Sequence, residues 1–190
     1  MTVYSNYLEN RRYNKLQFFE PYEYQKKFYS LRAANGKLAK ARCLLAANQI
    51  GKTLGEGAEL AIHATAQYPE WWDGAIVNPN PMMVCSGVNS YRTRDLIQKE
   101  LLGTSNKDDH ENLGTGFIPK HLIHKLDRKP GIPGAVEKII VKRNNAMELA
   151  TISLYGYEDG PQKVMGDRID YGWNDEEPPL EFWSQMVRGT

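Results

Sequence analysis

The chain has 190 residues, of which 41% are hydrophobic and 25% are charged, and its formal net charge is +1. This length suffices for one domain with a sizeable core. The near-neutral charge argues against a strongly basic protein that coats nucleic acid, although a local basic patch is compatible with it. No run approaches the roughly 20 apolar residues of a membrane-spanning helix, and the polar start MTVYSNYLENRRYNK is unlike a secretion signal. We therefore expect a cytosolic protein without a membrane segment.

Both cysteines, Cys43 and Cys85, lie within apolar runs. No CxxC spacing is present, which argues against a metal pair. We expect two buried, reduced thiols in a reducing compartment and no disulfide.

The first part of the chain alternates helical and strand-like patterns. Residues 1–20 form a polar, tyrosine-rich lead-in, and residues 22–34 have apolar side chains at helical spacing. The apolar run ARCLLAAN (41–48) predicts a buried strand. The next stretch, 53–67, predicts a helix with one apolar face.

After a loop with three prolines, the run 81–88 predicts a second buried strand and residues 91–102 predict a helix. Residues 103–134 are rich in Gly, Pro, Asn and Asp, so we expect an irregular insertion.

Three strands are expected in the last part of the chain. The runs 136–144 and 147–157 alternate in the manner of strands and meet near Asn144-Asn145, which predicts a hairpin. The run 168–177 predicts a strand that ends in acidic residues. Helices alternating with strands favour an α/β fold with a mostly parallel sheet, flanked by helices and carrying an antiparallel hairpin excursion.

The stretch LLAANQIGKT connects the predicted strand at 41–48 to the helix after it. A small residue followed by x-x-x-x-Gly-Lys-Thr in this context is the pattern of a phosphate-binding loop. Backbone N–H groups would surround the phosphates, Lys52 would reach the β and γ oxygens, and the Thr53 hydroxyl would bind Mg²⁺. The alternative is a glycine hinge at the start of a helix. The predicted phosphate-binding residues are Ala46, Ala47, Asn48, Gln49, Ile50, Gly51, Lys52 and Thr53.

Ala46 stands where the usual pattern has glycine. This first position of the loop needs a small residue, and Gly51, where the backbone must approach the phosphates closely, is present. The departure is therefore compatible with a working loop.

Asp175 and Glu176 end a strand-like run roughly 120 residues after the loop. Asp175 is expected to act on Mg²⁺, and Glu176 is expected to polarise the attacking water as the catalytic base. Glu177 could take the place of Glu176. The alternative is that the string DEEPP is a solvated acidic turn.

Gln25 lies in PYEYQKKF, about twenty residues before the loop. Its amide can donate to and accept from the edge of an adenine base, on which a neighbouring ring could stack. A surface glutamine on an amphipathic helix is an equally good interpretation.

Two sets of basic residues remain open. The clusters at 120–129 and 138–144 could contact a DNA backbone, but solvated faces are the preferred interpretation. Four arginines are candidates for an arginine finger: Arg92, Arg94, Arg143 and Arg168.

The order PYEYQKKF, LLAANQIGKT, GAELAIHATAQYPEWWDG and IDYGWNDEEPP resembles the large terminase subunit of tailed bacteriophages, closest to the branch found in short-tailed, headful-packaging phages. The resemblance extends over about residues 18–187, and the Asn-Gln pair in the loop and the HATAQYPEWWDG stretch are its narrowest features.

The resemblance implies a RecA-like P-loop ATPase of the class with an acidic catalytic base, formed here by residues 21–190. It implies ATP and Mg²⁺ as ligands and double-stranded viral DNA, the portal protein and the small terminase subunit as partners. The subunits would form a ring on the capsid portal in the host cytoplasm and pump DNA inward. By the same resemblance, Gln25 is the adenine-motif glutamine, Lys52 and Thr53 act on phosphate and metal, Asp175 binds magnesium, and Glu176 is the base.

Three departures from the family pattern stand out. Many terminases have Arg or Lys at the position of Asn48, and some have Arg-Gly where this chain has Met165-Gly166, which leaves Lys163 or Arg168 as substitutes. Family members also continue through a coupling motif and a nuclease domain, so we expect an N-terminal fragment or a separately encoded piece without nuclease activity. The alternatives to a motor are a nucleotide-binding module without turnover that docks to the portal or the small subunit, and a helicase-like ATPase.

Overall fold

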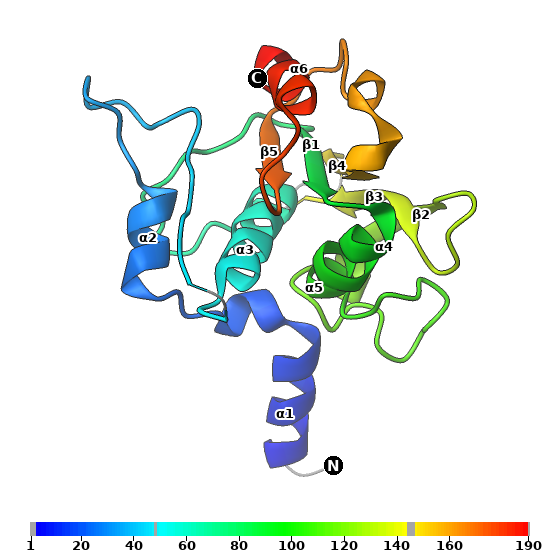
Figure 1. The fold of residues 1–190 in the computed structure, drawn as a ribbon. Coiled ribbons are helices and arrows are strands. Elements are labelled where there is room, and N and C mark those ends of the chain that lie inside the picture. Colours follow the sequence, from blue (N-terminus) through cyan, green and yellow to red (C-terminus); the bar gives the residue numbers. More distant parts are fainter. Residues whose placement is uncertain (1–2, 48, 144–146, 190) are drawn as a thin grey trace.

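The computed structural model describes residues 3–47, 49–143 and 147–189. Its centre is a five-stranded sheet with the order β2-β3-β4-β1-β5 (Figure 1). β1 runs parallel to β4 and β5, whereas β3 runs antiparallel to β4 and β2. The expected α/β sheet with an antiparallel excursion is confirmed, with the parallel part formed by β4, β1 and β5. The strands are β1 (Met82–Gly87), β2 (Ile123–Arg128), β3 (Val136–Lys142), β4 (Leu149–Gly156) and β5 (Tyr171–Asn174).

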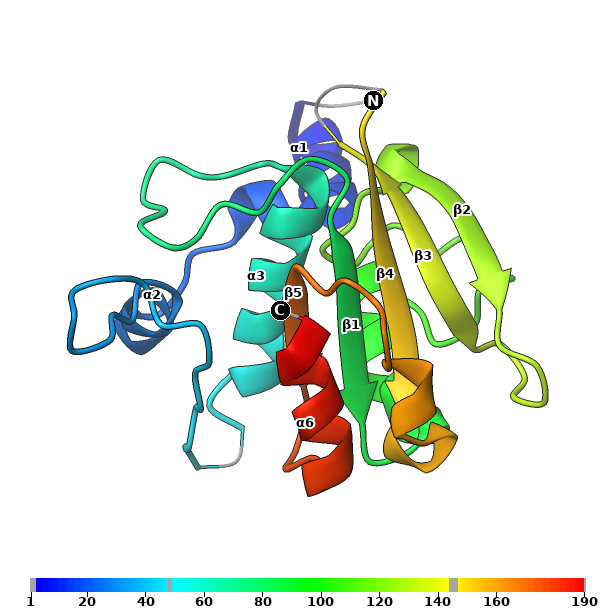
Figure 2. The same ribbon diagram turned by 90° about the horizontal axis from the view of Figure 1, so that it is seen from above.

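Helices cover both faces of the sheet, as the two views in Figures 1 and 2 show. One face carries α3 (Lys52–Thr65) and a continuous helical segment made of α4 (Ser90–Thr93), a π-helical turn (Arg94–Gln98) and α5 (Lys99–Leu102). The other face carries α6 (Leu180–Gly189). The helices expected at 53–67 and 91–102 are confirmed within two residues at each end.

β1 is apolar on both faces of the sheet. Met83 and Cys85 belong to the larger core cluster with α3 and α5, whereas Val84 belongs to the smaller cluster with Phe182 and Met186 of α6. Successive side chains of a strand point to opposite faces, so a strand covered on both sides must be apolar throughout. This is why the run at 81–88 was recognisable as a buried strand.

The prediction of a strand at 41–48 is wrong for residues 41–47, the part of this stretch that the structure describes. Residues 42–47 belong to no helix or strand, and they pair with no strand among the described residues. Arg42, Leu44 and Ala46 are partly covered, whereas the residues between them are exposed, including Leu45 at 90%. The expectation of two buried thiols is also half wrong, since Cys85 is buried and Cys43 is exposed. An apolar run predicts burial only where a neighbouring strand covers it, and the segment does not lie in the sheet.

The region 103–134 contains more regular structure than expected. Its second half forms β2, an edge strand that pairs with β3 with two irregularities in register. Its pattern IHKLDR is polar, as edge strands are, and only Ile123 and Leu126 pack against the core. The hairpin of β3 and β4 is confirmed, and its expected turn at Asn144-Asn145 lies outside the described residues.

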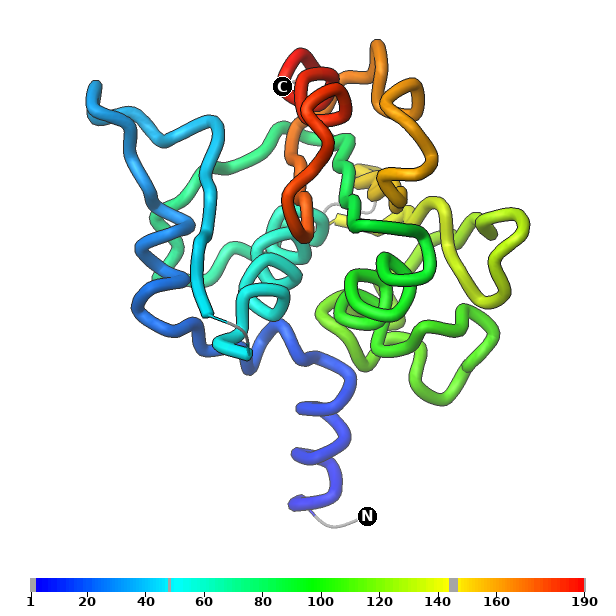
Figure 3. The backbone as a smooth tube through the Cα atoms, viewed as in Figure 1, coloured from blue at the N-terminus to red at the C-terminus, as the bar shows by residue number. Residues whose placement is uncertain are grey.

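The N-terminal part contains two short helices. α1 (Val3–Tyr13) has no buried residue and extends away from the body, as the tube in Figure 3 shows. α2 (Glu23–Tyr29) is shorter than the expected 22–34 and lies beside the phosphate-binding loop. Within the described ranges, no helix is both long and apolar enough to cross a membrane.

Candidate active site

The predicted phosphate-binding loop ends where α3 begins. Gly51 is the N-cap of α3 and has a left-handed backbone with φ of 90°, a conformation that glycine adopts without strain. The Lys52 ammonium donates to the carbonyl oxygens of Ala46 (2.6 Å) and Ala47 (3.0 Å). Gln49 is also left-handed, with φ of 61°, and Asn48 lies outside the described residues. The backbone thus curves around the Lys52 ammonium at the N-terminus of a helix, which is the arrangement that binds phosphate.

The predicted metal ligands meet at the end of the sheet. The Thr53 hydroxyl donates to Asp175 Oδ1 at 3.3 Å, although the two residues are 122 positions apart. The Asp175 N–H donates to the Ser86 carbonyl on β1 at 2.8 Å, which fixes the carboxylate at the end of β5. Burial raises the pKa of the Asp175 carboxyl and the nearby Glu176 adds to the rise, while the Thr53 hydroxyl and Lys52 oppose it.

This pair of oxygen ligands fits Mg²⁺. The ion prefers one or two protein oxygens and takes its other ligands from substrate phosphates and water. A cation at this position would also offset the repulsion between Asp175 and Glu176.

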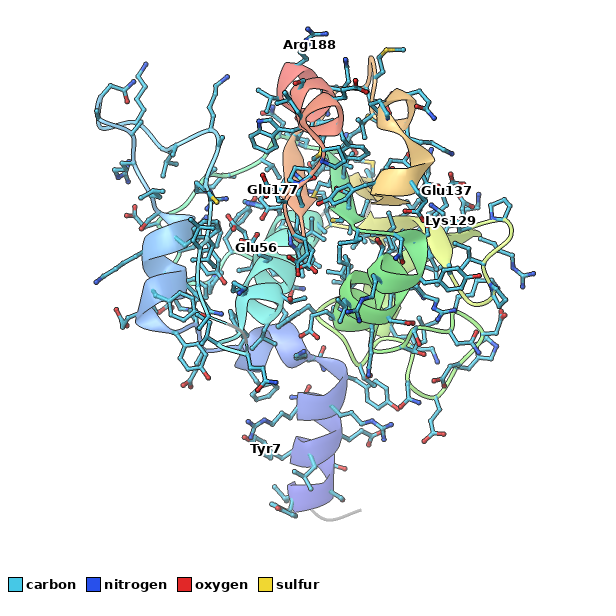
Figure 4. All side chains as sticks on the ribbon, in the orientation of Figure 1. Tyr7, Glu56, Lys129, Glu137, Glu177 and Arg188 are labelled. Atoms are coloured by element: carbon cyan, nitrogen blue, oxygen red, sulfur yellow. The ribbon has the colours of Figure 1, made fainter. Side chains whose placement is uncertain are left out.

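The two residues proposed for the base differ from Asp175 in exposure. Glu176 and Glu177 are both exposed, and Glu176 has a left-handed backbone with φ of 79°. The Tyr157 hydroxyl donates to the Glu176 carbonyl at 2.8 Å. Figure 4 labels Glu177, which follows at the same turn. Glu176 thus directly follows the proposed metal ligand Asp175, and its side chain is exposed.

Gln25 lies behind the loop with its amide engaged. Its Nε2 donates to the Gly51 carbonyl at 2.9 Å, and its Oε1 accepts from the Tyr22 N–H at 2.8 Å. The side chain is 1% exposed, and a Cβ on Gly55 would lie 2.6 Å from Nε2. In this arrangement the amide contacts the backbone of the loop.

Two tyrosines of α2 contact the same region. The Tyr24 hydroxyl donates to the Ile50 carbonyl at 2.5 Å, and the Tyr29 hydroxyl donates to the Gly55 carbonyl at 2.8 Å. With Gln25, α2 thus makes three hydrogen bonds to the loop and the first turn of α3. The sequence signal is the aromatic-rich stretch PYEYQKKF, whose glutamine the sequence analysis assigns either to adenine recognition or to the surface of an amphipathic helix.

A pocket of about 280 Å³ lies next to the first turn of α3. Aromatic and charged side chains that precede the loop line it together with one aliphatic residue of α3: Arg11, Lys15, Phe18, Phe19, Glu20, Tyr22 and Leu54. Aromatic walls with a few polar groups suit a planar base.

A buried ionisable cluster between α3 and β5 was missed by the sequence reasoning. Glu59 pairs with Arg42 at 2.7 Å, and its second oxygen has no hydrogen-bond partner among the residues that the structure describes. The Tyr171 hydroxyl donates to Glu56 Oε2 at 3.2 Å, and burial, with the charge of Glu59 next, raises the pKa of Glu56 to about 8. Figure 4 labels Glu56 on α3. The signal was available, because both acids occur among the apolar residues of the predicted helix.

The structure separates the four candidate arginines. Arg92 lines a small pocket of about 70 Å³ together with Asp175 and Glu176. The other three are held in ion pairs: Arg94 with Asp95, Arg143 with Glu148, and Arg168 with Asp170.

Residues 43–188 match the family described as terminase large subunit, T4-like virus type, N-terminal part. The large terminase subunit of Salmonella phage P22 is 30% identical over 200 aligned residues, which cover 96% of this chain and 39% of that protein. The chain therefore spans less than half the length of this relative. The solved ATPase domain of the large terminase of Thermus phage P74-26 has the same fold, with a TM-score of 0.51 and 18% identity over 92% of this chain and 61% of that one. The resemblance of the four sequence stretches is confirmed, and the chain belongs to the family of N-terminal regions of phage terminase large subunits.

Proposed function

We propose that this chain binds and hydrolyses ATP as the motor domain that powers translocation of viral double-stranded DNA into the procapsid. The observation that carries the proposal is the contact of Thr53 with Asp175, which joins the phosphate-binding loop to an acidic pair at the end of β5. Family membership supports a role in packaging, and an ATPase domain with this fold supports nucleotide hydrolysis.

The chemistry follows from the position of each group. The loop N–H groups and the Lys52 ammonium would neutralise the β and γ phosphates and orient them. Thr53 and Asp175 would hold Mg²⁺, which when bound offsets the charge that develops on the phosphate oxygens. Glu176, exposed and next to Asp175, would accept a proton from the attacking water. Arg92 is the candidate that supplies positive charge from the same pocket.

The base of ATP would occupy the pocket beside Tyr22 and Leu54. Gln25 would then act on the loop, through Gly51, as well as on the adenine edge. This retains the proposed adenine motif and adds a contact that the sequence did not predict.

The proposed partners are double-stranded DNA, the portal protein, the small terminase subunit and further copies of the chain in a ring. The proposed place of action is the host cytoplasm, at the procapsid portal during packaging. DNA contacts by the basic clusters at 120–129 and 138–144 stay a prediction.

A second candidate function is a nucleotide-binding module without turnover that docks to the portal or the small subunit. One observation favours it. The segment 42–47, which leads into the loop, is not paired with the sheet, so the loop is anchored on its α3 side and through α2.

ATP hydrolysis by the wild-type chain, Lys52→Ala and Glu176→Gln, with and without double-stranded DNA, tests these functions. We expect turnover in the wild type and a loss of about a hundredfold or more in Glu176→Gln, as removal of a general base typically causes. Glu177→Gln is the matched control and should keep most of the activity. Turnover that survives in Glu176→Gln contradicts the assignment of the base, whereas ATP binding without turnover in the wild type supports the binding module.

A further inference from the structure

The backbone at Glu176 has an unusual conformation. Its φ of 79° is in the left-handed region, where an L-amino acid with a Cβ is rarely found. Among the described residues, four that are not glycine have a positive φ: Gln49, Ala66, Asn80 and Glu176. Two of them, Gln49 and Glu176, lie in the two halves of the candidate active site. Such a conformation persists only where surrounding contacts hold it.

One side chain supplies the contact. The Tyr157 hydroxyl lies 2.8 Å from the Glu176 carbonyl oxygen and 3.4 Å from that of Asp175, and it donates chiefly to the first. Within the ranges that the structure describes, the carboxylate of Glu176 has no hydrogen bond or ion pair. The position of this carboxylate therefore depends on its backbone.

Tyr157 is itself held in place. It follows β4 at the start of a short 3₁₀ turn (Tyr157–Asp159), and its ring packs edge-on against Phe182 of α6, with centroids 5.4 Å apart. The ring is half-buried, and burial raises the pKa of the hydroxyl, which keeps it a donor at all ordinary pH values. The hydroxyl thus links two rigid elements, β4 and α6, to the acidic turn.

We infer that Tyr157 is a positioning residue for the reaction. Its hydroxyl holds Glu176 in the left-handed conformation that keeps this residue beside Asp175, in the small pocket that both residues line with Arg92. This inference rests on the proposed function for its consequence in catalysis, but the contact that it invokes can be tested separately.

Tyr157→Phe removes the hydroxyl and keeps the ring against Phe182. We expect kcat for ATP hydrolysis to fall about three- to tenfold, the effect of one hydrogen bond, with KM and the thermal midpoint nearly unchanged. Tyr155→Phe is the matched control, since Tyr155 is buried on β4, two residues before Tyr157, and its hydroxyl has no hydrogen bond within the described residues. It should leave kcat unchanged.

Amide hydrogen exchange of the peptide that contains residues 174–177 provides the second measurement. Exchange should be faster in Tyr157→Phe than in the wild type and in Tyr155→Phe. Unchanged kcat in Tyr157→Phe overturns the inference. If the wild-type chain does not hydrolyse ATP, the proposed function fails, and the exchange data alone decide whether Tyr157 holds the turn.

Discussion

Gln25 and Glu56 are polar side chains behind the loop, and their contacts determine what each can do. Gln25 contributes an amide that supports the loop at Gly51, and Glu56 contributes a carboxyl that accepts from Tyr171 of β5. The sequence predicts a contact with the nucleotide for Gln25, and it predicts no role for Glu56.

Gln25→Ala is expected to raise the Kd of GTP about three- to tenfold, because the loop loses one hydrogen bond, and to raise the Kd of ATP by more, because the proposed contact with the adenine edge is lost as well. Calorimetric titration of both nucleotides measures the two constants. Gln17→Ala, at an exposed position of the lead-in, serves as the control. A loss confined to ATP would show instead that the amide acts mainly by contacting adenine.

Glu56→Gln is expected to flatten the dependence of stability on pH. The raised pKa means that the folded protein keeps the Glu56 proton up to about pH 8, whereas the unfolded chain loses it near the ordinary glutamate pKa of 4.5. Unfolding therefore releases this proton between these values, and its contribution to stability falls as the pH rises. The charged groups that face Glu56 are Glu59, Arg42 and Asp175.

Thermal unfolding at pH 5, 6, 7 and 8 measures this effect. The midpoint of Glu56→Gln relative to the wild type should rise across the series, because glutamine carries no charge to bury. Glu9→Gln, on the exposed surface of α1, should show a constant difference. A constant difference for Glu56→Gln as well would contradict the raised pKa.

At the scale of elements, the two flanks of the loop are unequal. α3 is buried along most of its length, from Gly57 to Thr65, and forms the centre of the larger core cluster. The segment 42–47 pairs with no strand in the part of the chain that the structure describes, although its sequence is as apolar as that of a central strand. The contacts of α2 with Ile50, Gly51 and Gly55 hold the loop where a strand would otherwise do so.

The same substitution on both flanks tests this difference. Leu45→Ala should change the free energy of unfolding by less than about 0.5 kcal/mol, as exposed positions do, whereas Leu60→Ala, which is fully buried, should cost about 2–5 kcal/mol. Urea unfolding measures both values. A cost of several kcal/mol at Leu45 would mean that the segment is buried as a strand in solution.

At the scale of the whole molecule, the candidate site joins parts of the chain that are far apart. Thr53 lies in the first turn of α3, Asp175 follows β5, and the sheet between them is packed on both faces by separate core clusters. A ligand that bridges these two residues must stabilise the folded state, because the unfolded chain does not bring them together.

MgATP should therefore raise the thermal midpoint with increasing concentration. The expected stabilisation is about 2.7 kcal/mol when the free ligand is at one hundred times its Kd. Differential scanning fluorimetry measures the midpoint, and Lys27→Ala, at an exposed position of α2, should behave as the wild type. An equal rise in Lys52→Ala would indicate that the nucleotide binds elsewhere.

The sequence alone predicted the features that depend on local patterns. Gly51-Lys52-Thr53 before an apolar helix and Asp175-Glu176 after a short strand identified both halves of the site. Helical and alternating periodicity identified α3, β1 and the β3–β4 hairpin, because neighbouring residues determine which face of an element is apolar. The assignment of residues 1–20 as a lead-in stays a prediction.

The tertiary structure decided the features that depend on contacts between distant residues. It left Leu45 exposed and made 123–128 an edge strand, because burial depends on which elements lie alongside. It directed the Gln25 amide to the loop, separated Arg92 from the other three arginines, and brought Tyr157 to Glu176. Each of these depends on a distance across the fold, which spacing along the chain does not determine.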